Sequence, residues 1–154
     1  MIQRRTLLAA GAALPALSAC ATLGDTDDRA SLPPLPHDPH SHAKPDEARV
    51  LNVSLDLRAD FTQKVLSGTA TLTIAAREDA REIVLDVDGL NIGSVSGNGR
   101  ALAYTIGERR PELGAPMTIQ LDGARTITIA YATSPNAGAL QWLEPAQTSS
   151  GKPF

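Results

Sequence analysis

The segment VLNVSLDL, residues 50–57, decides the fold class of this chain. Its apolar residues occupy alternate positions: Leu51, Val53, Leu55 and Leu57. The positions between them are polar: Asn52, Ser54 and Asp56. A period of two residues is typical of a β-strand, because successive side chains point to opposite faces of a sheet. We therefore expect a half-buried strand here, with its apolar face against a core.

The same alternation recurs between residues 64 and 75, where Ala70, Leu72 and Ile74 alternate with threonines. Further short strands are expected over residues 83–87, 90–95, 101–106, 117–121 and 126–131. Two hairpin turns are predicted at Asn98-Gly99 and Asp122-Gly123, because these residue types tolerate the positive φ of tight hairpins. The predicted fold class is therefore all-β, with about seven short strands in antiparallel or mixed sheets.

The β-rich part, residues 46–154, is long enough to form one small domain. Aromatic residues make up only 3% of the chain, so its core is expected to rest on Leu, Val and Ile. The formal net charge is -3, which argues against a nucleic-acid-binding surface. We therefore expect no nucleic-acid partner.

Residues 1–20 resemble a bacterial lipoprotein signal peptide. Arg4 and Arg5 precede an apolar run, residues 6–17, that is too short to span a bilayer as a mature helix. The run ends on Leu-Ser-Ala-Cys, and Cys20 is the residue expected to carry the lipid. The arginine pair also resembles a twin-arginine export signal. The alternative is a plain signal peptide with an incidental cysteine.

This signal predicts an exported bacterial lipoprotein that faces the periplasm or the cell exterior. The lipid on Cys20 is expected to be its link to a membrane. Because Cys20 is the only cysteine of the chain, no internal disulfide can form.

Residues 21–45 are predicted to be a flexible, proline-rich linker. Its prolines fall close together: Pro33, Pro34, Pro36 and Pro39. Three histidines lie beside Asp38 in this segment: His37, His40 and His42. One interpretation is an adventitious metal site. The preferred one is a polar linker that contains histidines, because a metal site needs rigid geometry.

Many stretches from residue 38 onward resemble the leukotriene A(4) hydrolase branch of the aminopeptidase N family of zinc metallopeptidases. They are residues 38–47, 55–57, 60–61, 64–73, 83–86, 104–108, 134–135, 139–143 and 145–151. The resemblance implies a saddle-like N-terminal β-domain that packs on a catalytic zinc domain. It also implies a parent enzyme that removes N-terminal residues from peptides.

The motifs that carry this family's chemistry do not occur in the sequence. The zinc motif H-E-x-x-H places two histidines one helical turn apart, with a glutamate as the base for the metal-bound water. The histidines of this chain all precede residue 43, and none stands in such a motif. We assign no catalytic residue and no metal ligand, and expect zinc only in the parent enzyme. The isolated chain is predicted to be inactive as an aminopeptidase.

Other chemistries find little support in the sequence. Ser67 and Ser134 have no histidine at a plausible range for a serine triad. The glycine pair of residues 97–99 is interpreted as a turn and not as a phosphate loop. Asp86 and Asp88 are interpreted as a solvated strand end, with a carboxylate site as the alternative.

Two functions remain open. The first is the non-catalytic, truncated N-terminal part of a membrane-anchored zinc aminopeptidase. The second is a freestanding lipoprotein β-module that binds or scaffolds a partner. The final residues, 149–154, stop in the middle of a family motif, which favours the first function. Trp142 is expected to pack beside Leu140 and Leu143, and truncation predicts that these three residues leave an exposed apolar patch.

Overall fold

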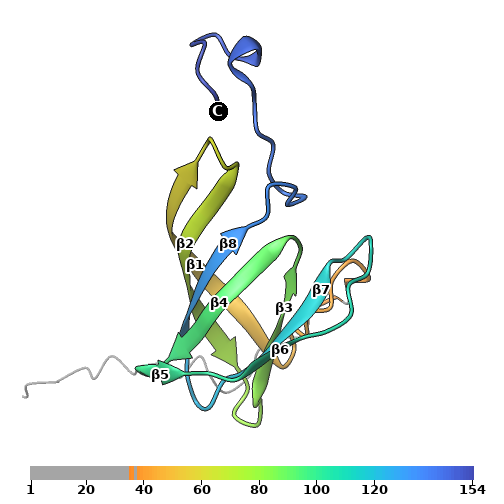
Figure 1. The fold of residues 1–154 in the computed structure, drawn as a ribbon. Coiled ribbons are helices and arrows are strands. Elements are labelled where there is room, and N and C mark those ends of the chain that lie inside the picture. The colour runs from red at the N-terminus through yellow and green to blue at the C-terminus, as the bar shows by residue number, and fades with distance from the viewer. Residues whose placement is uncertain (1–34, 37) are drawn as a thin grey trace, which may run out of the picture.

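The computed structural model describes residues 35, 36 and 38–154, and in this range the chain folds into two packed antiparallel sheets (Figure 1). The larger sheet has the order β1 (Ala48–Asp60), β2 (Val65–Ala76), β8 (Thr126–Thr133), β4 (Leu90–Gly97) and β5 (Arg100–Ala101). The smaller sheet has the order β3 (Glu82–Val87), β7 (Ala115–Gln120) and β6 (Tyr104–Ile106). A single 3-10 turn, η1, covers Pro145–Gln147. The all-β prediction is confirmed.

Two details of the predicted strands are wrong. Residues 101–106 were expected to form one strand, but they divide into β5 and β6, which belong to different sheets. Leu102 lies between them and is buried, so the chain crosses from one sheet to the other through the core. The turn at Asp122-Gly123 has the predicted positive φ, but it joins β7 to β8 and so links the two sheets.

The core lies between the sheets and is almost entirely aliphatic. Met117 and Ile119 on β7 face Ile127 on β8, and all three side chains are fully buried. The predicted alternation on β2 is also confirmed, since Leu72 and Ile74 are buried and the threonines between them are not. This periodicity is what fixes the pairing register of β2, because a slip of one residue would turn its apolar face to water.

β1 differs from β2, although the two strands pair along their whole length. Val53 lies opposite Leu72 in the ladder, and Leu55 lies opposite Ala70, so both belong to the core-facing side of the larger sheet. Yet Leu51, Val53 and Leu55 are 61%, 52% and 58% exposed. We call these three residues the apolar stripe. The expectation that this face of β1 is buried is therefore wrong for most of the strand.

The difference in sheet width explains the exposed stripe. β1 is the edge strand of a five-stranded sheet, and the sheet that covers it has only three strands. The covering sheet reaches the start of β1, where Ala48 is buried, and the register shifts between Val50 and Asn52. Beyond that shift the strand continues as a long hairpin with β2 (Figure 1). Gly68 lets the two strands approach closely, since a Cβ there would meet the carbonyl oxygen of Asp56.

Candidate functional site

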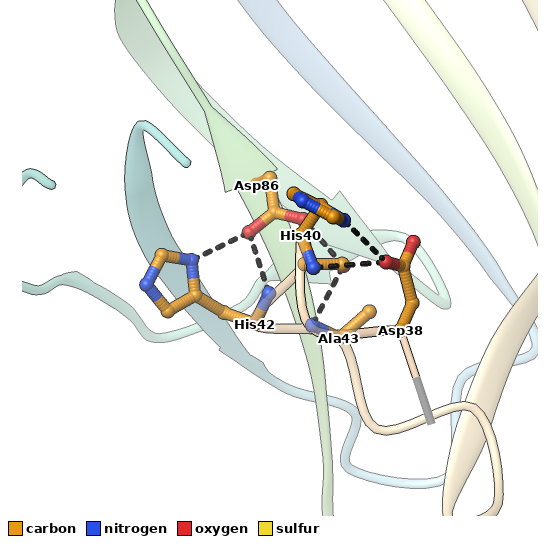
Figure 2. A network of polar contacts seen from close by, with 6 residues as sticks. Asp38, His40, His42, Ala43 and Asp86 are labelled. Carbon is orange, nitrogen blue, oxygen red and sulfur yellow. Dashed lines mark hydrogen bonds and ion pairs between the residues drawn. The ribbon is translucent and has the colours of Figure 1, made fainter. Parts of the chain in front are cut away.

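The densest polar network of the described residues surrounds Asp86, on the outward face of β3 (Figure 2). The Ser41 hydroxyl donates to its Oδ2 at 2.6 Å, and the His42 backbone N–H donates to its Oδ1 at 3.0 Å. Nδ1 of His42 lies 2.7 Å from the same Oδ1. The Ser41 oxygen in turn accepts a hydrogen bond from the Ala43 backbone at 3.0 Å. The Asp86 carboxylate thus holds residues 41 and 42, which precede β1, against β3.

These donors determine how Asp86 titrates. Partial burial acts to raise the pKa of Asp86, but the hydrogen bonds from Ser41 and from the backbone and ring of His42 outweigh it. The pKa of Asp86 therefore lies below its ordinary value of 3.8, and the side chain is a carboxylate at neutral pH. The segment from residue 38 to residue 45 is fastened to β3 by an anion. We call this segment the N-terminal clip.

The predicted linker, residues 21–45, includes the N-terminal clip, and the rest of it lies almost wholly outside the described residues. Sequence reasoning missed the clip because Ser41 and Asp86 are 45 positions apart. The only signal was the run of small and polar residues at 38–42, which is equally typical of a linker. Asp86 and Asp88, considered together in the sequence, have separate partners in the structure: Asp86 binds the clip, and Asp88 binds Arg109.

The histidines of the segment do not converge on one point. His42 is turned toward Asp86, whereas His40 is highly exposed and has its Nδ1 3.6 Å from Asp38 (Figure 2). His37 lies outside the described residues. Within the described part of the chain, no group of three or more His, Cys, Asp or Glu side chains is arranged to hold a metal ion.

Ser41, His42 and Asp86 are the residue types of a serine hydrolase, but their arrangement is different. In a triad the serine bonds to the imidazole and the imidazole bonds to the carboxylate. Here the serine and the imidazole both bond to the carboxylate, so no base is placed on the hydroxyl. The network holds the chain in place and does not activate a nucleophile.

Three further contacts lie outside this network, one at Asp88 and two at the C-terminal end of the domain. Nε of Arg109 donates to Oδ1 of Asp88 at 2.9 Å, which raises the pKa of Arg109. The ring of Trp142 packs edge-on against Phe61 in the β1–β2 turn, with centroids 5.8 Å apart. Nζ of Lys64 reaches Oε1 of Glu144 at 2.7 Å beside it. These last contacts attach residues 139–154, the C-terminal segment, to the tip of the hairpin.

The C-terminal segment also closes on itself. The backbones of Leu143 and Phe154 exchange two hydrogen bonds, at 2.6 and 3.1 Å, around the η1 turn. Leu140, Trp142 and Leu143 are half-buried, so the expected exposed patch at these three residues is wrong. Phe154 is exposed at the end of this segment, but the largest group of neighbouring exposed apolar residues lies on β1.

The remaining predicted site residues cannot be placed in the fold. Cys20, Arg4 and Arg5 lie outside the described residues. Across residues 35, 36 and 38–154, no helix is long and apolar enough to cross a membrane.

The chain has relatives among characterised proteins. It is 34% identical over 119 residues to leucine aminopeptidase 2 of Yarrowia lipolytica, which covers 75% of this chain and 18% of that protein. It is 31% identical over 119 residues to leukotriene A-4 hydrolase of Xenopus laevis, covering 73% of this chain and 20% of that protein. The chain thus spans about a fifth of the length of these relatives. No family model matches the sequence.

Solved structures give the same result. Native yeast LTA4 hydrolase superimposes with a TM-score of 0.70 at 28% identity, over 85% of this chain and 21% of that one. The yeast LTA4 hydrolase complex with bestatin gives a TM-score of 0.69 at 27% identity over 77% of this chain. The shared region is the N-terminal β-domain of that enzyme. The chain carries the N-terminal β-domain of the leukotriene A4 hydrolase and leucine aminopeptidase 2 family.

Proposed function

We propose that this domain is the non-catalytic N-terminal part of a zinc aminopeptidase that is exported and anchored to a membrane. The observation that carries the proposal is the apolar stripe on β1. Val53 and Leu55 continue the core face of the larger sheet, yet the smaller sheet does not cover them, and Leu51 lies at the register shift without a partner in the ladder. The sequence relationship to leucine aminopeptidases suggests what does: the remaining part of such an enzyme, including its catalytic zinc domain.

The energetics favour a covered stripe. Burying one Val or Leu side chain contributes about 1.5–3 kcal/mol. Exposed apolar residues so close together on one strand are a costly surface to leave in water, and contiguous exposed apolar residues mark interaction sites. The charges of this edge strand, Arg49, Asp56, Arg58 and Asp60, lie outside the stripe and do not interrupt Val53 and Leu55. A covering protein surface accounts for the exposure of Val53 and Leu55 on the same face.

The chemistry of the proposed enzyme lies outside this domain. When zinc is bound by the catalytic part, it activates a water molecule for attack on the peptide bond. The domain described here holds no such site among its described residues, and its role is to complete the fold on which the catalytic part rests. The side chains that do this are those of the apolar stripe.

The location of the enzyme is the second part of the proposal. The lipobox cysteine, Cys20, and the arginine pair Arg4 and Arg5 support export and lipid attachment to a membrane, with the protein facing the periplasm or the cell exterior. Expression in a Gram-negative host tests this. We expect a lipid-modified, membrane-bound protein for wild type and unmodified protein for Cys20→Ala. Equal fractionation of both, with no lipid mass on the wild type, contradicts the proposed anchor.

A domain replacement tests the proposed function. Residues 38–154 would replace the matching segment of Yarrowia lipolytica leucine aminopeptidase 2, and hydrolysis of a leucine anilide would be measured. We expect activity from the hybrid and none from the same enzyme with the segment deleted. Leu55→Glu in the hybrid is expected to lower its thermal stability, whereas the matched exposed change Ala103→Glu is not.

A hybrid that folds but melts equally with and without Leu55→Glu contradicts the proposal. Such a result favours the alternative, a freestanding lipoprotein module whose stripe binds a different partner.

A further inference from the structure

An apolar cavity opens between the two sheets, next to the apolar stripe. Its volume is about 150 Å³. The two walls come from opposite sheets, with Leu72 on one side and Leu85 on the other. Met117 forms its floor and is completely buried. The lining is apolar apart from Tyr131 and Asp86, and the donors of the N-terminal clip already occupy the Asp86 carboxylate.

The cavity and the stripe form one continuous surface. Ala70 and Leu72 line the cavity, and in the β1–β2 ladder they lie directly opposite Leu55 and Val53 of the stripe. Directly opposite residues on one face of an antiparallel pair are in contact. A protein segment that covers the stripe therefore passes the mouth of the cavity.

From this geometry we infer that the cavity receives one large apolar side chain, aliphatic or aromatic, from the protein part that covers β1. This inference rests on the proposed function. The inserted side chain is the anchor of the interface, and the stripe is the flat surface around it. Interfaces take most of their binding energy from such side chains in well-packed pockets, with weaker contacts around them.

The size and polarity of the cavity determine the class of side chain. A space of roughly 150 Å³ with an apolar lining is large enough for a molecule of the size of benzene. Leucine, methionine and phenylalanine side chains fit this description. A charged side chain does not, because all lining residues except Tyr131 and Asp86 are apolar and offer it little compensation for desolvation.

The first test asks whether the cavity admits an apolar group, and it uses toluene as the probe. Met1 and Met117 are the only methionines, so labelling of methionine methyl groups gives a single signal from the folded domain. We expect toluene to shift the Met117 methyl resonance in a saturable manner in the full chain. Ala70→Leu fills the cavity and should abolish the shift, whereas Ala103→Leu, an equal change on the surface, should not. No shift in the wild type overturns the inference.

The second test uses the hybrid enzyme described above. Ala70→Leu is expected to lower the leucine anilide activity of the hybrid at least tenfold at a temperature where the unmodified hybrid is stable, because the anchor is displaced. Ile92→Phe, which narrows the opposite side of the cavity, provides a second variant if Ala70→Leu fails to fold alone. Thermal melting of each variant as a free chain identifies such a failure.

The outcomes separate the two proposals. A hybrid that loses stability with Leu55→Glu but is unaffected by both cavity-filling variants overturns the anchor and leaves the proposed function intact. A hybrid whose thermal stability is unaffected by Leu55→Glu overturns the proposed function. It also overturns the inserted anchor side chain, which rests on that function. Loss of toluene binding and of hybrid activity in the same cavity-filling variants supports the inference.

Discussion

The β1–β2 hairpin contacts the C-terminal segment at its tip, whereas its outer strand is bare. At the tip, Phe61 packs on Trp142 and Lys64 pairs with Glu144 of the C-terminal segment. A few residues earlier on the same strand, the apolar stripe has no covering layer among the described residues. The difference shows that apolar character does not by itself decide burial, because a side chain also needs a surface that reaches it.

The largest difference in stability is expected between two variants that shorten a leucine on neighbouring strands of this hairpin. Leu72 is 5% exposed and Leu55 is 58% exposed, although both belong to the core-facing side of the sheet. Leu72→Ala should lower the free energy of unfolding by about 2–5 kcal/mol. Leu55→Ala should change it by less than about 0.5 kcal/mol. Urea denaturation of both variants measures the difference.

Equal losses in the two variants would break the comparison, because they would mean that the stripe is buried in the free chain.

The next effect concerns the N-terminal clip, which, like the C-terminal segment, is fastened to the domain by polar contacts. Asp86→Asn removes the carboxylate that Ser41 and His42 share, and should cost about 1–2 kcal/mol. Hydrogen exchange should increase at residues 41–43. Asp88→Asn, two positions along, breaks only the exposed contact with Arg109 and is the matched control. Faster exchange at residues 41–43 in the control would show that the clip depends on general charge and not on Asp86.

The same contacts predict how the clip depends on pH. Because the pKa of Asp86 is lowered in the folded chain, its contribution to stability is present above its ordinary pKa of 3.8 and is lost as pH falls through the lowered value. The protection of the backbone amides of residues 41–43 against hydrogen exchange, relative to their intrinsic exchange rates at each pH, should therefore fall in acid before the core unfolds. In Asp86→Asn this acid dependence should be absent. An unchanged profile in the variant contradicts the assignment to Asp86.

A smaller effect is expected at the covered tip of the hairpin. Phe61→Ala and Trp142→Ala should be coupled by about 0.5–1.5 kcal/mol in a double-mutant cycle, since the rings pack edge to face. Coupling near zero would mean that the C-terminal segment does not rest on the hairpin in solution.

The smallest effect on stability is expected from a charge in the stripe. Leu55→Glu should leave the free energy of unfolding of the free chain within about 0.5 kcal/mol of wild type, because the side chain is exposed. It should reduce self-association measured by light scattering, since it interrupts an exposed apolar edge strand. Thr73→Glu on the neighbouring strand is the control for added charge. Equal self-association of the two variants would mean that the stripe is not the surface through which the free chain associates.

The sequence predicts local features of this fold well. The period of two residues identifies the strands, and Leu72 and Ile74 are buried as the alternation on β2 indicates. Asn98 and Gly99 both have positive φ, as the hairpin prediction requires. These features depend on neighbouring residues, so a short window of sequence contains the information.

Features that depend on distant segments could not be predicted in this way. The exposure of Leu55 depends on the width of a sheet built from residues 82–120, which the alternation on β1 does not report. The clip depends on Asp86, far along the chain from Ser41. Likewise, the partial burial of Trp142 involves Phe61 in the hairpin turn. In each case the missing information is a long-range contact.

The most direct test of the central claim is the reactivity of a cysteine placed in the stripe. Leu55→Cys in a Cys20→Ala background provides a single thiol, and its rate of maleimide labelling would be measured in the free chain and in the hybrid enzyme. We predict rapid labelling in the free chain and strong protection in the hybrid, with Leu72→Cys slow in both. Slow labelling of Leu55→Cys in the free chain, or equally rapid labelling in the hybrid, would contradict the account.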